Sequence, residues 1–286
     1  MPQRRDYIDE LKGLGILLVV LGHFIEQYRM GYSFVSASFF CIYAFHMALF
    51  CICSGLVARF NPRKLVTQQL WLYLVGQTLM LAFRAAVLRE NFAETGGLLA
   101  AWLLPWRHIW YLYALIFWHL TLPVLCRLRD RLAAFAAEHR PVRLVAAAGL
   151  VLGYGAYFLW VLRADPIMDH SAELFHDVSY AGGDRVQYRV VFYLVGIATT
   201  AALTVLASRW HLLAGLGRHT LAIYLLHLPV QALLVELGLY DLMRGKATIV
   251  VVLWSVLLAA VTLAVLNLSP VQRACDAVTN CWYKRK

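Results

Sequence analysis

The chain has 286 residues and a formal net charge of +10; 62% of its residues are hydrophobic and only 15% are charged. Soluble domains are about 45–50% apolar and about 25% charged, so this composition excludes an ordinary soluble protein and indicates an integral membrane protein. The basic excess requires no nucleic-acid partner, because arginines in cytoplasmic loops account for it. We expect an all-α fold, a polytopic transmembrane helical bundle that forms a single domain over residues 1–286.

Apolar stretches of about 20 residues, the length that crosses a bilayer, predict about eight spans. In chain order they cover residues 13–32, 38–58, 69–88, 109–126, 144–162, 188–206, 220–239 and 248–268. Residues 97–106 are apolar but too short to cross, so we expect a re-entrant or interfacial segment there. A signal peptide is the alternative for the first stretch; its length and its internal His23 and Glu26 argue against that alternative.

Charged residues in the loops predict the orientation of the bundle. Basic residues precede the first span, follow the second, fourth and sixth spans, and end the chain, which places all of them on one side of the membrane. The loop over residues 163–187 carries five acidic residues and lies on the other side. The positive-inside rule then places both termini in the cytoplasm. The acidic loop would lie outside, as a cover for an acceptor or as a solvated linker.

The first span carries a polar stripe inside an otherwise apolar helix. Lys12 and His23 are eleven residues apart, which amounts to roughly three helical turns and about 16 Å along one face. Asp9 and Glu26 fall near the same stripe, each three residues from one of them. Ionisable groups at membrane depth are costly and usually line a functional cavity. The stripe therefore makes His23 the main candidate for catalysis.

His46 lies in the second span at a depth similar to that of His23. A short connection joins the two spans, so they should pack antiparallel, and the two imidazoles could face each other across one cavity. Imidazole suits a general base because its ordinary pKa lies close to neutral pH. The alternative for any one of these histidines is a structural role, as a hydrogen-bonded polar residue between two helices.

Two further segments could contact a substrate. Trp110 lies in an aromatic run, residues 106–113, which is either an interfacial aromatic belt or a substrate platform. Tyr224 and His227 are one turn apart and share a helix face, which suits a hydrogen-bonded pair lining a cavity. A structural role for this pair is an equal alternative.

Three motifs in order carry a resemblance to a known family. They are the segment from Ile8 to His23 with its basic residue and histidine, the segment from Phe45 to Gly55, and the segment from Thr220 to His227. The chain resembles the integral-membrane acyltransferase type 3 family, which moves acyl groups from acyl-CoA to extracytoplasmic glycans and related acceptors. Position 12 is a lysine where the family more often has an arginine, which makes the chain similar to the fucose 4-O-acetylase-like branch. Ala48 departs from the usual proline, and eight spans are fewer than the usual ten.

The resemblance implies a multi-pass O-acetyltransferase of the bacterial inner membrane, with acetyl-CoA as co-substrate and a glycan or lipid-linked sugar as acceptor. It implies His23 as general base, with Glu26 or His46 orienting the ring or stabilising charge; an acyl-histidine intermediate is an alternative. The donor would bind at the cytoplasmic mouth beside Lys12, Asp9, Arg63 and Lys64, where the basic members of this set suit its phosphates. Lys12 could instead form a structural ion pair with Asp9. The acceptor would lie against Trp110, Tyr224 and His227.

No metal is expected, because no spacing of the six cysteines resembles a zinc site. The sequence leaves the oligomeric state open; the lipid bilayer is the one partner that composition requires. The main rival function is a proton-coupled secondary transporter of a sugar or anion, in which the histidines relay protons. The hydropathy shows no inverted repeat or paired broken helices, which argues against the transporter. A non-catalytic glycan-export subunit is a weaker third possibility.

The first prediction concerns topology. Cysteines introduced at Ser171 and Ser208 should report opposite sides of the membrane to an impermeant thiol reagent in intact cells, with Ser171 labelled and Ser208 protected. Labelling at Ser208 alone would invert the orientation. The donor mouth would then face a compartment without acyl-CoA.

Overall fold

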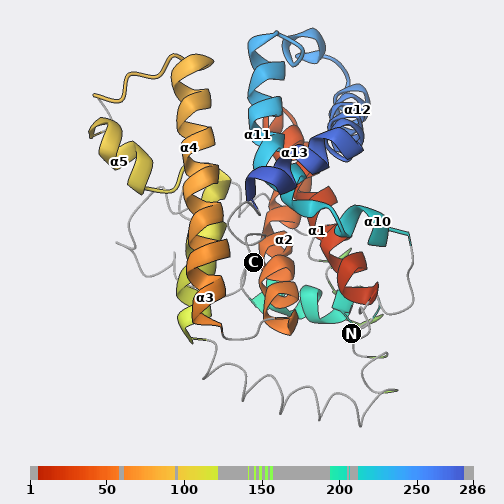
Figure 1. The fold of residues 1–286 in the computed structure, drawn as a ribbon. Coiled ribbons are helices and arrows are strands. Elements are labelled where there is room, and N and C mark those ends of the chain that lie inside the picture. The colour runs from red at the N-terminus through yellow and green to blue at the C-terminus, as the bar shows by residue number, and fades with distance from the viewer. Residues whose placement is uncertain are drawn as a thin grey trace, which may run out of the picture.

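The computed structural model describes residues 6–57, 61–93, 96–121, 194–204 and 212–279, with isolated helical positions between 141 and 156 and at 206. Within these ranges every regular element is a helix, which confirms the all-α expectation (Figure 1). The predicted span over residues 144–162 and the loop over 163–187 fall outside the continuously described ranges.

The helices follow the apolar stretches closely. The longer ones are α1 (Asp6–Glu26), α2 (Ser33–Val57), α4 (Trp71–Ala86), α11 (Thr220–Glu236), α12 (Thr248–Leu266) and α13 (Ser269–Thr279). The shorter ones are η1 (Arg29–Gly31), α3 (Pro62–Lys64), the π-helix η2 (Leu65–Leu70), α5 (Gly97–Leu103), η3 (Arg107–Ile109), α10 (Ala214–Gly217) and η5 (Asp241–Met243). Residues 110–121 and Leu194–Thr204 are also helical.

Two of the described helices are long and apolar enough to cross a membrane, α2 and α12. α11 and Leu194–Thr204 are apolar but shorter. These helices support a membrane protein, while the number of eight spans and the orientation stay predictions. The segment predicted as interfacial forms the short helix α5, as its length requires.

α1 is the central helix of the described bundle and packs against α2, α10, α11 and α12. It begins and ends earlier than the apolar stretch predicts. Its start includes the acidic residues Asp9 and Glu10, which are buried because neighbouring groups pair with them. Its end tightens into η1, where Tyr28 and Gly31 donate backbone hydrogen bonds to earlier carbonyls.

The N-terminal end of α1 meets α10 at close range. A Cβ atom at Gly217 would overlap the carbonyl oxygen of Asp9, so only glycine allows this approach. The Glu10 carboxylate accepts hydrogen bonds from the backbone N–H groups of Leu213 at 2.8 Å and Ala214 at 3.1 Å. A carboxylate at a helix N-terminus satisfies donors that have no partner within the helix. Glu10 therefore fixes the segment that leads into α11.

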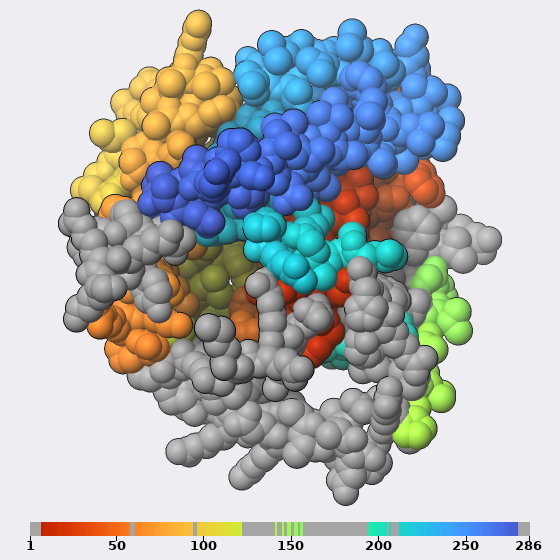
Figure 2. Space-filling view, turned by 45° about the vertical axis from the view of Figure 1, so that its right-hand side comes forward, coloured from red at the N-terminus to blue at the C-terminus, as the bar shows by residue number. Residues whose placement is uncertain are grey.

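α13 lies across the same end of the molecule. Figure 2 shows it in deep blue as a band that runs from α12 towards α4, with α10 beside it in cyan. The Trp71 indole N–H donates to the Val278 carbonyl at 3.2 Å, and the Gln272 amide donates to the Leu266 carbonyl at 2.7 Å. The start of α4 and the chain after α12 thus share one end with the start of α1.

The opposite end of α1 is covered by the connection between α11 and α12. The Tyr28 hydroxyl donates to the Tyr240 carbonyl at 2.7 Å, and the Tyr32 hydroxyl donates to the Lys246 carbonyl at 2.9 Å. These bonds tie the 237–247 loop to the turn between α1 and α2.

We predict that Glu10 is a stability residue. Glu10→Ala leaves the partly buried N–H groups of Leu213 and Ala214 without their acceptor. An unsatisfied group costs about 1–3 kcal/mol when it is fully buried and less when water reaches it, so the melting temperature in detergent should fall. Glu10→Gln keeps one acceptor oxygen, so its melting temperature should fall less. Glu236→Ala, at an exposed position, is the control and should melt like the wild type. Equal melting of Glu10→Ala and the control would contradict this role.

Candidate active site

Polar side chains from α1, α2, η3 and α11 meet inside the bundle, and we call this set the histidine cluster. Its members are His23, Glu26, Tyr43, His46, His108, Tyr224 and His227. The cluster brings together residues that are more than 200 positions apart in the chain.

His23 is held through one ring nitrogen. Its Nδ1 lies 2.9 Å from the Tyr43 hydroxyl and 3.3 Å from a carboxylate oxygen of Glu26, one helical turn away. With the proton on Nδ1, both oxygens can accept from it, and Nε2 keeps its lone pair. Nε2 has no hydrogen-bond partner among the described residues. The side chains of His23 and Glu26 are 15% and 29% exposed, which makes this the open side of the cluster.

We expected the imidazoles of His23 and His46 to face each other across a cavity. In the structure the two rings are not in direct contact. Tyr43 lies between them: its hydroxyl bonds to His23, and its ring centroid is 4.7 Å from that of His46. His46 is buried, and its Nδ1 donates to the Ile42 carbonyl in its own helix at 2.8 Å. Tyr43, one turn before His46, is thus the residue that connects the first two motifs.

His227 is fully buried and packs against two other imidazoles. Its ring centroid is 5.2 Å from that of His23 and 4.9 Å from that of His108. Its Nδ1 donates to the carbonyls of Ile223 at 3.0 Å and Tyr224 at 2.9 Å. The side-chain hydrogen bond expected between Tyr224 and His227 is absent, because the Tyr224 hydroxyl instead donates to the carbonyl of His108.

His108 enters the cluster on a strap that follows α4 and whose described residues are 87–93 and 96–109. The Arg84 side chain forms two hydrogen bonds with the Glu90 carboxylate, at 2.7 and 2.5 Å, and its guanidinium lies over the rings of Phe92 and Trp106 at 5.1 and 5.4 Å. Arg107 has a left-handed backbone, with φ of +42°. Arg84 therefore anchors both ends of the turn that aims His108 inward.

Trp110 is not brought into the cluster. It is 41% exposed, whereas its neighbour Tyr111 is 6% exposed. The Tyr111 hydroxyl bonds with the Ser54 hydroxyl at 2.7 Å, and its ring packs against Tyr224 at 5.9 Å. His108 and Tyr111 are the members of this run that reach the interior, while Trp110 faces outward, where its role as a substrate contact stays a prediction.

The residues predicted at the donor mouth lie at the other end of α1 and do not converge on one point. Lys12 is half-buried and forms no ion pair within the described part of the chain. Asp9 lies 3.9 Å from the Arg218 guanidinium. Arg63 and Lys64 are exposed on α3, whose first turn is capped by the Asn61 side chain.

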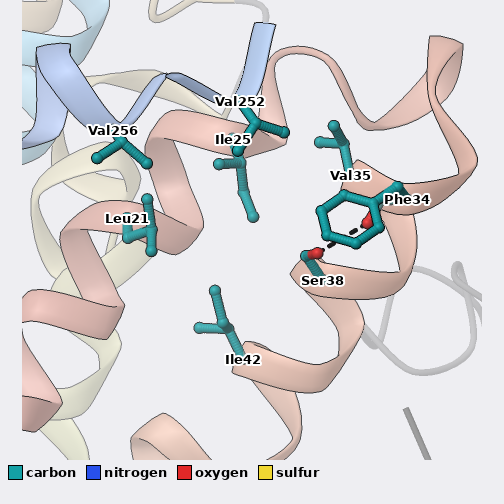
Figure 3. A pocket seen from close by; sticks show the side chains of 8 residues that line it. All are labelled: Leu21, Ile25, Phe34, Val35, Ser38, Ile42, Val252 and Val256. Carbon is teal, nitrogen blue, oxygen red and sulfur yellow. Dashed lines mark hydrogen bonds between the residues drawn. The ribbon is translucent and has the colours of Figure 1, made fainter. Parts of the chain in front are cut away.

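An apolar cavity of about 100 Å³ lies on the other side of α1 (Figure 3). It is lined by Leu21, Ile25, Phe34, Val35, Ser38, Ile42, Val252 and Val256. Leu21 and Ile25 are each two residues from His23, which turns them to the opposite helix face. The Ser38 hydroxyl is already bonded to the Phe34 carbonyl at 2.8 Å. The cavity therefore offers no reactive group, and the chemistry belongs to the histidine cluster.

No set of three metal-binding side chains is close enough to hold an ion within the described ranges. The cluster is thus a group of imidazole, phenol and carboxylate side chains suited to proton transfer and hydrogen bonding.

Comparison with known proteins gives one match. A family model described as an acyltransferase domain matches residues 5–135. This region contains His23, Glu26, Tyr43, His46 and His108, while Tyr224 and His227 lie beyond it. No curated protein and no solved structure matches the chain.

We predict that the Arg84–Glu90 pair makes stability depend on pH. The hydrogen bonds from Arg84 hold the pKa of the Glu90 carboxyl below its ordinary value of 4.5. Because the folded-state pKa is lowered, the stabilisation is present above the unfolded-state pKa and is lost as the pH falls through the folded-state pKa.

Thermal unfolding in detergent from about pH 7 to about pH 3 should show this loss. Glu90→Gln should melt at a lower temperature than the wild type near pH 7, and the difference should shrink in acid. A difference that is constant across this range would argue against the pair as its source.

Proposed function

Because the chain belongs to the acyltransferase type 3 family, we propose that it transfers an acetyl group from cytoplasmic acetyl-CoA to a hydroxyl of a glycan or lipid-linked sugar outside the membrane. One observation supports this most: the Nδ1 of His23 is engaged by Glu26 and Tyr43, and its Nε2 is left available at the open side of a buried cluster. This is the arrangement that a general base requires.

His23 would act through Nε2. It takes the proton of the acceptor hydroxyl as that oxygen forms a bond to the thioester carbonyl carbon. The carbon–sulfur bond then breaks, and the proton passes from Nε2 to the leaving thiolate. Glu26 holds the ring by its Nδ1–H and stabilises the imidazolium that forms, which is the role of the carboxylate in a catalytic triad.

The donor would enter at the end of α1 that carries Lys12. On the α1 helix, Lys12 lies about 16 Å from His23 along the axis, a gap that a pantetheine arm can span. Arg63 and Lys64 add positive charge for the phosphates. Asp9 has a different role in this proposal, since its proximity to Arg218 would order the basic mouth without contacting an anionic donor.

The acceptor would approach from the opposite end, where His23 and Glu26 are partly exposed. His227 lies directly behind His23, while Trp110 is turned away from the cluster and would contact only the outer part of a glycan. We place the protein in the bacterial inner membrane, because in this proposal the donor is cytoplasmic and the acceptor is not.

We predict that His23 is essential for chemistry but not for folding. His23→Ala should lower acetyl transfer by about 10²–10⁴-fold, the usual effect of losing a general base. The measurement is thiol release from acetyl-CoA by the purified protein in nanodiscs, with and without a glycan acceptor.

His219→Ala, which removes an exposed histidine at the start of α11, is the matched control and should keep wild-type turnover. Near-normal turnover of His23→Ala would contradict the assignment of His23 as the general base. Substrate transport into sealed vesicles without thioester loss would favour the transporter instead.

A further inference from the structure

Two arginines lie at the exposed edge of the histidine cluster, Arg29 on η1 and Arg107 on η3. We propose that Arg107, with Arg29 beside it, binds an anionic group of the acceptor, a phosphate or a carboxylate carried by the sugar. The inference rests on the proposed function and narrows its acceptor from any glycan to an anionic one.

Both guanidinium groups are close to the side chains proposed to react. Arg29 follows Glu26 by three residues, and the charges of both arginines act on Glu26 and on Tyr43. Within the described residues, Glu26 is the one carboxylate that acts on Tyr43 together with them. Two cations therefore share one carboxylate at the side of the cluster where His23 and Glu26 are partly exposed. This edge carries an excess positive charge, which favours an anionic ligand.

The Arg107 guanidinium is held in place without the use of its hydrogen-bond donors. It lies over the Trp106 ring at 5.4 Å from the centroid, and the Arg84 guanidinium lies at the same distance from that ring. Among the described residues, the Arg107 side chain forms no hydrogen bond or ion pair. Its N–H donors therefore remain available, in the planar arrangement that pairs with two oxygens of a phosphate or carboxylate.

The backbone of Arg107 gives a second reason to assign it a binding role. Its φ of +42° lies in the left-handed region, which glycine adopts without strain and arginine does not. The turn that directs His108 inward would therefore be more stable with glycine at this position. Residues strained in this way concentrate at ligand-binding sites, where the side chain is needed for a contact.

The end of the bundle that carries this pair is the one predicted to face outside. Lys12 lies at the other end, on the side that the positive-inside rule assigns to the cytoplasm. That rule gives no reason for Arg29 and Arg107 on the outer face. Another basic side chain at this end, Arg244, is already paired with Asp241 at 3.1 Å. An anionic acceptor supplies the partner that Arg107 lacks within the described residues.

The first test measures binding. Titration calorimetry with the protein in phosphatidylcholine nanodiscs compares glucose 1-phosphate and methyl glucuronide with the neutral methyl glucoside. An anionic probe should bind at least about tenfold more tightly than the neutral one. Arg107→Gln should lower the affinity for that probe by about 10–100-fold, the usual effect of losing a hydrogen bond to a charged group. The anionic probe with the larger loss identifies the recognised group as a phosphate or a carboxylate.

Arg89 offers a matched control. It is exposed on the same strap and also has a left-handed backbone, with φ of +50°, but no described contact joins it to the cluster. Arg89→Gln should keep the wild-type affinity for each probe. Arg107→Gly removes the guanidinium and relaxes the backbone, so it should melt at or above the wild-type temperature and still lose the anionic probe. This variant separates binding from folding.

Equal affinity for the anionic and neutral probes would overturn the proposal, as would equal losses in Arg107→Gln and Arg89→Gln. A weaker affinity of Arg107→Gln for acetyl-CoA alone would assign this arginine to the donor and overturn the proposal too.

Thiol release from acetyl-CoA distinguishes this inference from the proposed function. Binding of an anionic probe that depends on Arg107, without any thioester loss, would remove the function and keep the site. Thiol release that methyl glucoside stimulates as much as the anionic probes do would keep the function and overturn the inference.

Discussion

Polar side chains inside an apolar bundle have no water to complete their hydrogen bonds, and this constraint governs the arrangement of the histidine cluster. His46 and His227 satisfy this constraint by donating hydrogen bonds from Nδ1 to backbone carbonyls of their own helices, which fixes their tautomers. His23 meets it with Glu26 and Tyr43, which can also exchange protons. The three histidines therefore differ in chemistry although they share one interior. The one whose partners are ionisable side chains is the one suited to react.

α1 connects the two ends of this arrangement. At its start, Glu10 and Asp9 hold the segment that leads into α11, and at its end Tyr28 holds the loop that leaves α11. α11 is thereby fixed against α1 from both ends, which sets His227 behind His23. Residues far from the cluster therefore determine the distance between its imidazoles, and the glycine at position 217 is part of that control.

The sequence predicted the all-α class, the span-like helices, and the one-turn contact of His23 with Glu26, because helical periodicity alone determines these. It did not predict His108, which reaches the interior only because Arg84, Glu90 and the left-handed backbone of Arg107 turn the strap inward. Tyr43 could have been found, since it lies one turn before His46 on the same face. The sequence did not show that Tyr111 faces inward and Trp110 outward, because an aromatic run has no polarity pattern that distinguishes the inner face from the outer one.

The region recognised as an acyltransferase domain ends at residue 135, yet its central helix packs on α10, α11 and α12, which all follow that point. The N–H groups that Glu10 satisfies belong to Leu213 and Ala214, and the imidazole behind His23 belongs to His227. The limit of detectable sequence similarity is therefore not the limit of a folding unit. A fragment cut at this boundary would expose the apolar faces of α1 and leave a buried carboxylate without its donors. The stretch that matches the family model is therefore shorter than the stretch whose helices pack together around α1.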